Sequence, residues 1–260
     1  MSTHAGALRD SMTMLRRNLK HAKRYPSLTF GTLLIPVLLL LIFAGVFGRT
    51  LGAGIGGGHY IDYIAPGIFL IAATGGAIGT AVGISMDMTE GIINRFRTMA
   101  ISPASVLTGH VLGSVIQTLL SIVLVVGVAA LMGFRPDASV VEWLAAFGLL
   151  ALLTLALTWV SAGIGLVARN PESASNIPTP FTFLPMLGSG FVPPESMPAG
   201  VRWFAEHQPF TPMIETLRGL LLGTPIGNDG LVALAWCAVL TVVGYLWAKA
   251  TFRRDPKPGR

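Results

Sequence analysis

The sequence predicts an all-α membrane protein with six transmembrane helices, and three observations support this fold class. Only 12% of the 260 residues are charged, whereas 52% are hydrophobic and the mean hydropathy is +0.68. The apolar residues are clustered in stretches of about 20 that contain no Lys, Arg, Asp or Glu, which is the length that crosses a bilayer. The Lys and Arg residues are distributed unevenly between these stretches. Such a composition argues against a soluble enzyme and against a disordered chain.

The first 27 residues are polar and basic, and we expect an amphipathic helix that lies on the membrane surface. They contain six Lys and Arg residues against one Asp. Four apolar residues recur at helical spacing before Pro26: Leu8, Met12, Leu15 and Leu19. A helix with one basic and one apolar face suits the interface of an anionic membrane. A solvated basic tail is the alternative.

Six apolar stretches are predicted to cross the membrane within one transmembrane domain, residues 28–252, which is followed by a basic tail at 253–260. The six stretches cover residues 28–47, 63–85, 106–132, 143–168, 176–192 and 231–248. The fifth stretch is interrupted by Pro178, Pro180 and Pro185. Prolines are tolerated in a membrane span where neighbouring groups satisfy the freed backbone. The fifth span is therefore the least regular of the six.

A Gly-rich loop at residues 48–59 separates the first two stretches. Gly52, Gly54 and Gly57 match the dinucleotide fingerprint G-x-G-x-x-G by spacing alone. That fingerprint requires a preceding strand and a following helix, whereas a membrane span precedes the loop here. We interpret the loop as a flexible linker.

The basic residues predict the orientation of the chain. With the N-terminus in the cytoplasm, the inner segments hold 14 of the 18 Lys and Arg residues. The outer loops then hold the other four: Arg49, Arg135, Arg202 and Arg218. This bias follows the positive-inside rule and predicts that both termini are cytoplasmic.

The second stretch carries small residues along one helix face. They are Ala72, Gly76, Gly79 and Gly83. Small residues let helix backbones approach closely in a bilayer. The close approach can occur within one subunit or at a dimer interface, and the residues leave both readings open.

No catalytic or metal-binding constellation is found in the sequence. The histidines do not form H-E-x-x-H, no serine has glycine at both −2 and +2, and no lysine has a P-loop context. The spans lack Asp and Glu, which argues against an ion-coupled carrier. His110 has no acidic partner in its own span, so we interpret it as a polar anchor at a helix end. Cys237 has no second cysteine to pair with and is expected to be buried as a small hydrophobe.

The polar segment at residues 87–102 is the most informative part of the chain. Its charged residues alternate with Ile92, Phe96 and Met99, which would share one stripe of a helix. A short amphipathic helix of this kind can lie on lipid or dock into a groove of a soluble partner. The residues alone leave both possibilities open.

Two motifs in the sequence resemble those of ABC-2-type permeases, the membrane subunits of bacterial ABC exporters. The stretch Glu90-Gly91-x-x-x-Arg95-Phe96-Arg97, followed by Ser102, resembles the family pattern E-G-T-x-x-R-x-R-x-x-P-x-S, with Ile92 and Ala100 as departures. The second motif combines Leu184-Pro185, Ser189-Gly190 and Met197-Pro198 and continues into Gln208-Pro209, where the family commonly has Asn-Pro. With the six-span layout, the resemblance covers nearly the whole chain and is nearest to the daunorubicin-resistance type of drug permease.

The resemblance implies a type V ABC exporter fold in the bacterial inner membrane, with an N-terminal elbow helix. Residues 87–98 would form the coupling helix that docks on a separate ATPase subunit. The candidate coupling residues are Asp87, Glu90, Gly91, Arg95, Phe96 and Arg97. No cofactor or metal is expected on this chain, because ATP and Mg would bind to the partner ATPase.

The resemblance also implies a second, identical permease chain. The substrate path would run between the two chains and would be lined mainly by the second and fifth spans. The candidate path residues are Thr74, Gly76, Gly79, Thr80, Gly83, Thr179, Thr182, Phe183, Met186 and Ser189. Residues 193–229 would form short re-entrant helices that close the outer side. The candidate outer-gate residues are Phe191, Pro209, Thr211, Glu215 and Arg218.

The function expected from this resemblance is ATP-driven export of a hydrophobic or amphipathic small molecule. An uncharged path suits such a cargo better than an ion. Export of a lipid or polysaccharide precursor by the same mechanism is the main alternative. An ion-coupled carrier and a membrane-embedded enzyme are more distant alternatives, because the chain has neither visible inverted repeats nor a catalytic constellation.

Overall fold

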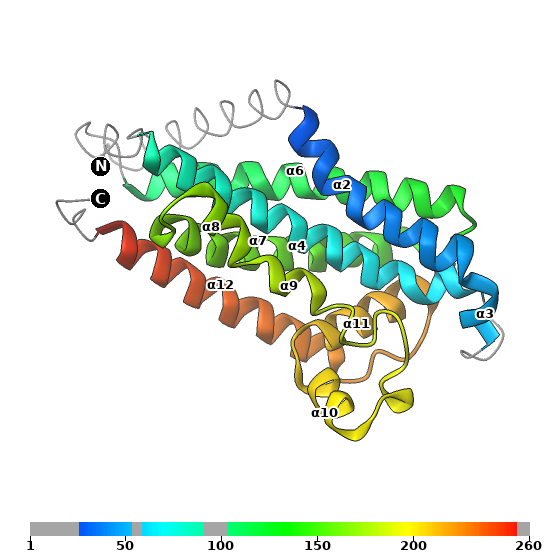
Figure 1. The fold of residues 1–260 in the computed structure, drawn as a ribbon. Coiled ribbons are helices and arrows are strands. Elements are labelled where there is room, and N and C mark those ends of the chain that lie inside the picture. The colour runs from blue at the N-terminus through cyan, green and yellow to red at the C-terminus, as the bar shows by residue number, and fades with distance from the viewer. Residues whose placement is uncertain (1–25, 54–58, 91–102, 254–260) are drawn as a thin grey trace.

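The computed structural model describes residues 26–53, 59–90 and 103–253, which form a bundle of helices without a strand in these ranges (Figure 1). Several predictions concern residues outside these ranges. They are the N-terminal amphipathic helix, part of the Gly-rich loop, most of the coupling segment and the basic tail. The all-α class is confirmed for the part of the chain that is described.

Four helices are long and apolar enough to cross a membrane. They are α4 (Tyr60–Thr89), α6 (Pro103–Leu131), α7 (Val140–Val167) and α12 (Asp229–Arg253). These helices correspond to the second, third, fourth and sixth predicted spans. The six-span count stays a prediction, because the first and fifth predicted spans are not among the four.

The first predicted span contains a change of helix type. The helix α2 (Pro26–Leu40) leads directly into the π-helix η1 (Leu41–Val46), and the short helix α3 (Gly48–Gly52) follows. Its apolar part, Leu33–Val46, is shorter than the four candidate spans.

The predicted fifth span, residues 176–192, does not form one continuous helix. The helix α8 (Pro171–Asn176) is followed by α9 (Thr179–Phe183), and the chain then continues through turns. Proline lacks an N–H donor and clashes with the preceding helical turn, which explains why the helix is interrupted near Pro178, Pro180 and Pro185.

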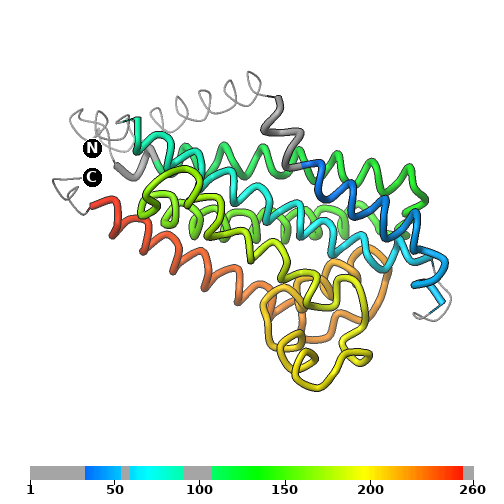
Figure 2. The backbone as a smooth tube through the Cα atoms, in the orientation of Figure 1, coloured from blue at the N-terminus to red at the C-terminus, as the bar shows by residue number. Residues whose placement is uncertain are grey.

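The chain between α9 and α12 forms a compact segment of short helices. They are η3 (Pro194–Ser196), α10 (Ala199–His207) and α11 (Phe210–Leu222). Gly223 ends α11 with a φ of 72°, a left-handed conformation that favours glycine. This segment and α3 lie at one end of the bundle, and the end of α12 lies at the other end (Figures 1 and 2).

Local sequence signals explain where α7 and α8 begin. Ser139 and Glu142 form a reciprocal capping box at the start of α7, in which the Ser139 backbone N–H donates to Glu142 Oε2 over 2.6 Å. The Asn170 side chain accepts a hydrogen bond of 2.7 Å from the Ser173 backbone N–H at the start of α8. Each cap satisfies a backbone donor that the helix itself cannot pair.

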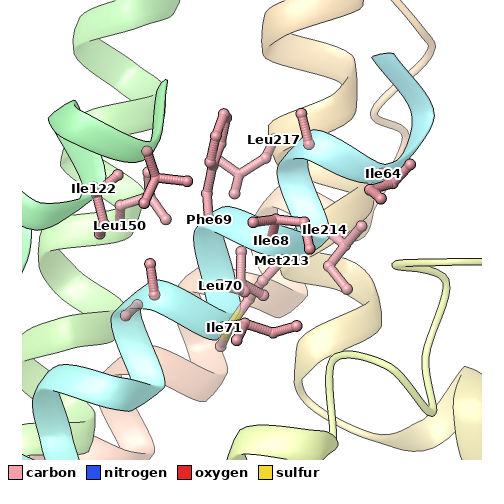
Figure 3. Close-up of a cluster of buried hydrophobic side chains, with 14 of the residues drawn as sticks. Ile64, Ile68, Phe69, Leu70, Ile71, Ile122, Leu150, Met213, Ile214 and Leu217 are labelled. Atoms are coloured by element: carbon pink, nitrogen blue, oxygen red, sulfur yellow. The ribbon is translucent and has the colours of Figure 1, made fainter. Parts of the chain in front are cut away.

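The helix α4 is the centre of the bundle and contacts α2, α6, α7, α8, α9 and α11. The half of α4 that begins at Tyr60 supplies several of the largest fully buried side chains, which meet those of α6, α7 and α11 (Figure 3). The labelled members of this core are Ile64, Ile68, Phe69, Leu70, Ile71, Ile122, Leu150, Met213, Ile214 and Leu217. The core therefore joins the long helices to the segment of short helices between α9 and α12.

Glycines on α7 and α12 bring the long helices close together. A Cβ at Gly165 would lie 2.6 Å from the Ala81 carbonyl oxygen of α4. A Cβ at Gly244 would lie 2.7 Å from the Val160 backbone nitrogen of α7. Only glycine permits this separation, as expected for helices that pack in a bilayer without a hydrophobic driving force between them.

Candidate functional site

A buried arginine joins three parts of the chain at the end of the bundle where α4 begins. Arg218 of α11 is only 7% exposed, and its Nη1 donates to Glu215 Oε1 over 2.6 Å. Its Nη2 donates to the carbonyl oxygens of Ser189, at 2.9 Å, and Tyr63, at 3.1 Å. The planar, multidonor guanidinium thus ties α11 to the start of α4 and to the turn after α9.

Two tyrosines in the first turn of α4 complete this connection. The Arg218 guanidinium carbon lies 4.0 Å from the centre of the Tyr63 ring, a cation–π contact. The Tyr60 hydroxyl donates to the Phe191 carbonyl oxygen over 2.9 Å, and the two tyrosine rings stack with centroids 6.4 Å apart. The start of α4 therefore holds the chain between residues 189 and 191 through side-chain and backbone groups.

A contact between two glycine backbones brings the same turn against α4. A Cβ at Gly67 would lie 2.8 Å from Gly190 Cα, and a Cβ at Gly190 would lie 2.6 Å from the Pro185 carbonyl oxygen. Real Cβ atoms do not reach such distances without a shift of the backbone. The Ser189-Gly190 motif thus allows the chain after α9 to lie directly on α4.

A glutamine holds the other side of the turn. Gln208 Nε2 donates to the Leu184 carbonyl oxygen over 3.0 Å, and Thr211 Oγ1 donates to the Ala205 carbonyl oxygen over 2.5 Å. A Cβ at Gly188 would lie 2.7 Å from Thr211 Oγ1, so this glycine leaves room for both side chains. Three buried polar atoms in this region find no hydrogen-bond partner within the described ranges: Ser189 Oγ, Gln208 Oε1 and Arg218 Nε.

The structure brings the five predicted outer-gate residues into this one region. Glu215 and Arg218 pair on α11, Thr211 lies in the first turn of α11, and Pro209 is its N-cap. The Phe191 ring packs edge-on against Phe43, with centroids 4.8 Å apart. Their role in gating stays a prediction.

The sequence reasoning did not identify Tyr60, Tyr63 and Gln208 as site residues. Gln208 was part of a motif but was not assigned a role. The available signal was the three-residue spacing of Tyr60 and Tyr63 at the start of an apolar stretch, which places both on one face of a helix. The partners of the two tyrosines lie far away in the chain. Tyr60 is 131 residues from Phe191, and Tyr63 is 155 residues from Arg218.

The predicted path residues on α4 divide into buried and open positions. The hydroxyls of Thr74 and Thr80 donate to carbonyl oxygens of their own helix, those of Ile71 and Gly76. Gly76 packs against the Thr118 side chain of α6. Within the described chain, nothing approaches within 4 Å of a Cβ built at Gly79 or Gly83. The small-residue face is therefore used for internal packing at one end and is open at the other.

The predicted path residues after α8 also differ in exposure. Phe183 is 54% exposed, whereas Ser189 is fully buried. The Thr179 hydroxyl donates to the Ser175 carbonyl oxygen over 2.7 Å, and Thr182 Oγ1 is buried with no partner in the described part of the chain. Met186 is half-buried and packs against the main core.

The opposite end of α4 contains a buried carboxylate–histidine contact that is not predicted from the sequence. The predicted second span ended at residue 85 and had no carboxylate, but α4 continues to Thr89 and includes Asp87. Asp87 Oδ2 lies 2.9 Å from His110 Nε2 of α6, and both residues are buried. His110 has no acidic partner in its own span, as the sequence indicates, but the structure gives it one on the preceding helix, which the interpretation as a helix-end anchor does not include.

The predicted coupling residues are only partly within the described ranges. Asp87 is buried in the last turn of α4, and Glu90 directly follows that helix and is exposed. Gly91, Arg95, Phe96 and Arg97 lie outside the described residues, so their contacts with an ATPase stay a prediction.

Comparison with known proteins identifies the family. A family model described as ABC-2 type transporter matches residues 10–222. The chain belongs to the ABC-2 type transporter family. In this ABC-2 transporter chain the match includes the open face of α4 and ends at Leu222, the last residue of α11.

Curated relatives agree with this family. The ABC-2 transporter chain is 27% identical to the daunorubicin resistance ABC transporter permease protein DrrB1 of Streptomyces coeruleorubidus, over 85% of this chain and 77% of the relative. It is 24% identical to the probable doxorubicin resistance ABC transporter permease protein DrrC of Mycobacterium tuberculosis, over 94% of this chain and 91% of the relative. A third relative, ABC transporter G family member 20 of Dictyostelium discoideum, is 26% identical over 72% of this chain and 25% of its own length.

Proposed function

We propose that this chain is the permease subunit of an ATP-driven ABC exporter, which moves a hydrophobic or amphipathic small molecule out across the cytoplasmic membrane. One observation carries the proposal: the chain belongs to the ABC-2 type transporter family and aligns over most of its length with relatives named as drug-resistance permeases. The four long apolar helices supply the membrane-spanning part that such a subunit needs.

ATP hydrolysis is assigned to a separate ATPase subunit, which would bind ATP and Mg. The sequence has no P-loop, so the energy for transport must come from a partner. The docking region is residues 87–98, with Arg95 and Arg97 as ionic contacts and Phe96 as an apolar anchor. Support for this location is that the end of α4 at Thr89 and the start of α6 at Pro103 lie at the same end of the bundle as the end of α12 (Figure 1).

A second permease chain would complete the transport path. The open face of α4 at Gly79 and Gly83 and the exposed ring of Phe183 are available for contact with another chain or with cargo. These groups carry no charge, which suits a hydrophobic or amphipathic molecule. Both termini would be cytoplasmic, in agreement with the charge bias of the loops.

The outer segment would act as the gate on the external side. Arg218, Tyr63 and Glu215 hold the turn after α9 against α4 in a buried network. A network of a few hydrogen bonds can exist in two discrete arrangements, which is what alternating access requires of a gate. ATP binding in the partner would move α4 and α6 through the coupling segment and release this network.

The test uses the full-length chain purified with its co-purifying partner in mild detergent. We expect a stoichiometric P-loop ATPase, identified by mass spectrometry, and ATP-dependent accumulation of daunorubicin in inverted proteoliposomes. A Walker-lysine variant of that ATPase is the matched control and should abolish accumulation. A chain that purifies without an ATPase and transports daunorubicin in the absence of ATP would contradict the proposal and would favour an ion-coupled carrier.

A further inference from the structure

The Asp87–His110 ion pair joins the two helices on either side of the coupling segment. Asp87 lies in the last turn of α4 and His110 lies near the start of α6, and the distance between Oδ2 and Nε2 is 2.9 Å. The side chains are 10% and 11% exposed, so that solvent screens the contact little. Both residues belong to helices that are long and apolar enough to cross a membrane, and ionisable residues within such helices are a default indication of function.

The surroundings of this ion pair are apolar and separate from the main core. A second cluster of buried side chains connects α4, α6, α7 and α12 at this end of the bundle. Its buried members are Ile84, Leu107, Val111, Trp159, Ala162, Leu166, Ala248 and Phe252. Ile84 precedes Asp87 by one helical turn, and Leu107 precedes His110 by one turn, so that the cluster borders the ion pair along both helices.

Stability alone does not explain a buried carboxylate–histidine contact at this position. Replacement of such a buried pair by well-packed apolar residues is often neutral or stabilising, because ionisable groups lose their hydration on burial. The attested advantage of a buried polar contact is that it specifies one register between two helices. Here the register concerns the two helices that lead into and out of residues 91–102.

We infer that Asp87 and His110 are positioning residues that hold the ends of α4 and α6 in register, so that a displacement of the coupling segment moves both helices together. This inference rests on the proposed function, since it assumes that an ATPase acts on the coupling segment. Asp87 then affects transport through its contact with His110 inside the membrane subunit. Glu90, Arg95, Phe96 and Arg97 remain the candidate contacts with the ATPase.

The experiment measures the number of daunorubicin molecules transported per ATP hydrolysed, in proteoliposomes that contain the complete complex. Asp87→Asn and His110→Gln should each lower this ratio by about fivefold or more. Fivefold is the lower end of the typical coupling between two sites of a protein. The ATPase should still co-purify with both variants. Asp62→Asn is the matched control, because it is the same substitution at the opposite end of the same helix, and it should leave the ratio unchanged.

Two double variants separate positioning from simple stability. The apolar variant Asp87→Leu with His110→Leu should keep the complex assembled and thermally stable, but with the low transport ratio of the single variants. The exchanged variant Asp87→His with His110→Asp should recover most of the ratio, because it restores the contact in the reverse order. A positioning role is supported when the exchanged variant recovers the transport ratio and the apolar variant does not.

Full transport per ATP in the apolar double variant would overturn the inference, because a filled core would then suffice. A wild-type ratio in both single variants would overturn it as well. Failure of the wild-type complex to bind an ATPase or to transport would instead refute the proposed function, so the two failures are distinguishable.

Discussion

Arg218 and Tyr63 are 155 residues apart in the chain, yet the Arg218 guanidinium carbon lies 4.0 Å above the centre of the Tyr63 ring and Nη2 donates to the Tyr63 carbonyl oxygen over 3.1 Å. Tyr63 therefore contacts the cation with both its ring and its backbone. Glu215 is the counter-ion at Nη1, and Nη2 also donates to the Ser189 carbonyl oxygen. The contact between Arg218 and Tyr63 connects the first turn of the central helix α4 to α11.

Arg218→Lys tests this connection. A lysine ammonium cannot reproduce the planar fork, so at least one of the three accepting oxygens should lose its donor. We expect the free energy of unfolding in detergent to fall by about 1.5–3 kcal/mol, the range for hydrogen bonds to charged groups. Thermal unfolding followed by tryptophan fluorescence measures the change. Arg202→Lys, which affects an exposed ion pair on α10, should leave the Tm unchanged.

Tyr60→Phe tests the hydrogen bond between α4 and the turn that contains Phe191. The substitution removes only the hydroxyl and leaves the buried Phe191 carbonyl oxygen without this donor. The expected loss of stability is about 1–3 kcal/mol, because an unsatisfied buried acceptor loses its hydration as well as its partner. If this turn closes the outer gate, vesicles with the variant should also leak preloaded dye faster than wild-type vesicles, and equal leakage would contradict the gating role.

Gly67→Ala tests the close approach of the turn to α4. The added methyl group would lie 2.8 Å from Gly190 Cα, so one backbone must move, and overpacking of this kind typically costs about 1–3 kcal/mol. The matched control is Gly148→Ala on α7, where nothing in the described chain lies within 4 Å of the new Cβ. The control should be neutral or slightly stabilising, because alanine favours the helix. Equal effects of the two substitutions would refute the packing argument.

Gly79→Leu tests the role of the open part of the small-residue face. No described residue contacts a Cβ at this position, so the folded monomer should tolerate the larger side chain. If the open face borders the transport path or a second chain, transport should fall at least severalfold while the Tm of the monomer is retained. Normal daunorubicin transport by this variant would show that the face points to lipid.

Arg95→Glu combined with Arg97→Glu tests the coupling segment. Reversal of two charges at a contact with the ATPase should separate ATP hydrolysis from transport, while membrane insertion is retained. Phe96→Ala should weaken co-purification of the ATPase more than either single charge reversal, because buried aromatic anchors contribute more than ion pairs at the rim of an interface. Normal transport by the double variant would contradict the coupling assignment.

The positions of the long helices were predictable because hydropathy and proline are local properties. The stretches at 63–85, 106–132, 143–168 and 231–248 each match a helix of the structure, and the prolines near residue 180 correctly indicated an interruption. The boundaries were less accurate. The predicted second span omitted Asp62 and Asp87, whereas backbone hydrogen bonds continue the helix over both.

The pairings within the site were not predictable in the same way. Asp87 and His110 were both noted in the sequence, but hydropathy windows placed one in a loop and the other at a helix end. Their contact depends on the relative rotation of α4 and α6, which is determined by side-chain packing along both helices. The same holds for Tyr60 and Phe191, whose contact requires the turn after α9 to fold back on α4.

The sequence by itself determined that this protein is a helical membrane protein, where most of its spans lie, and which family motifs it carries. These features follow from the cost of exposing polar backbone to lipid and from short patterns of residues. Only the tertiary structure decided that Arg218 meets Tyr63 and Ser189, that Asp87 meets His110, and that Gly79 stays open while Gly67 is closed against Gly190. Such contacts depend on how helices distant in the chain are rotated and packed against each other, and no local pattern of residues specifies that geometry.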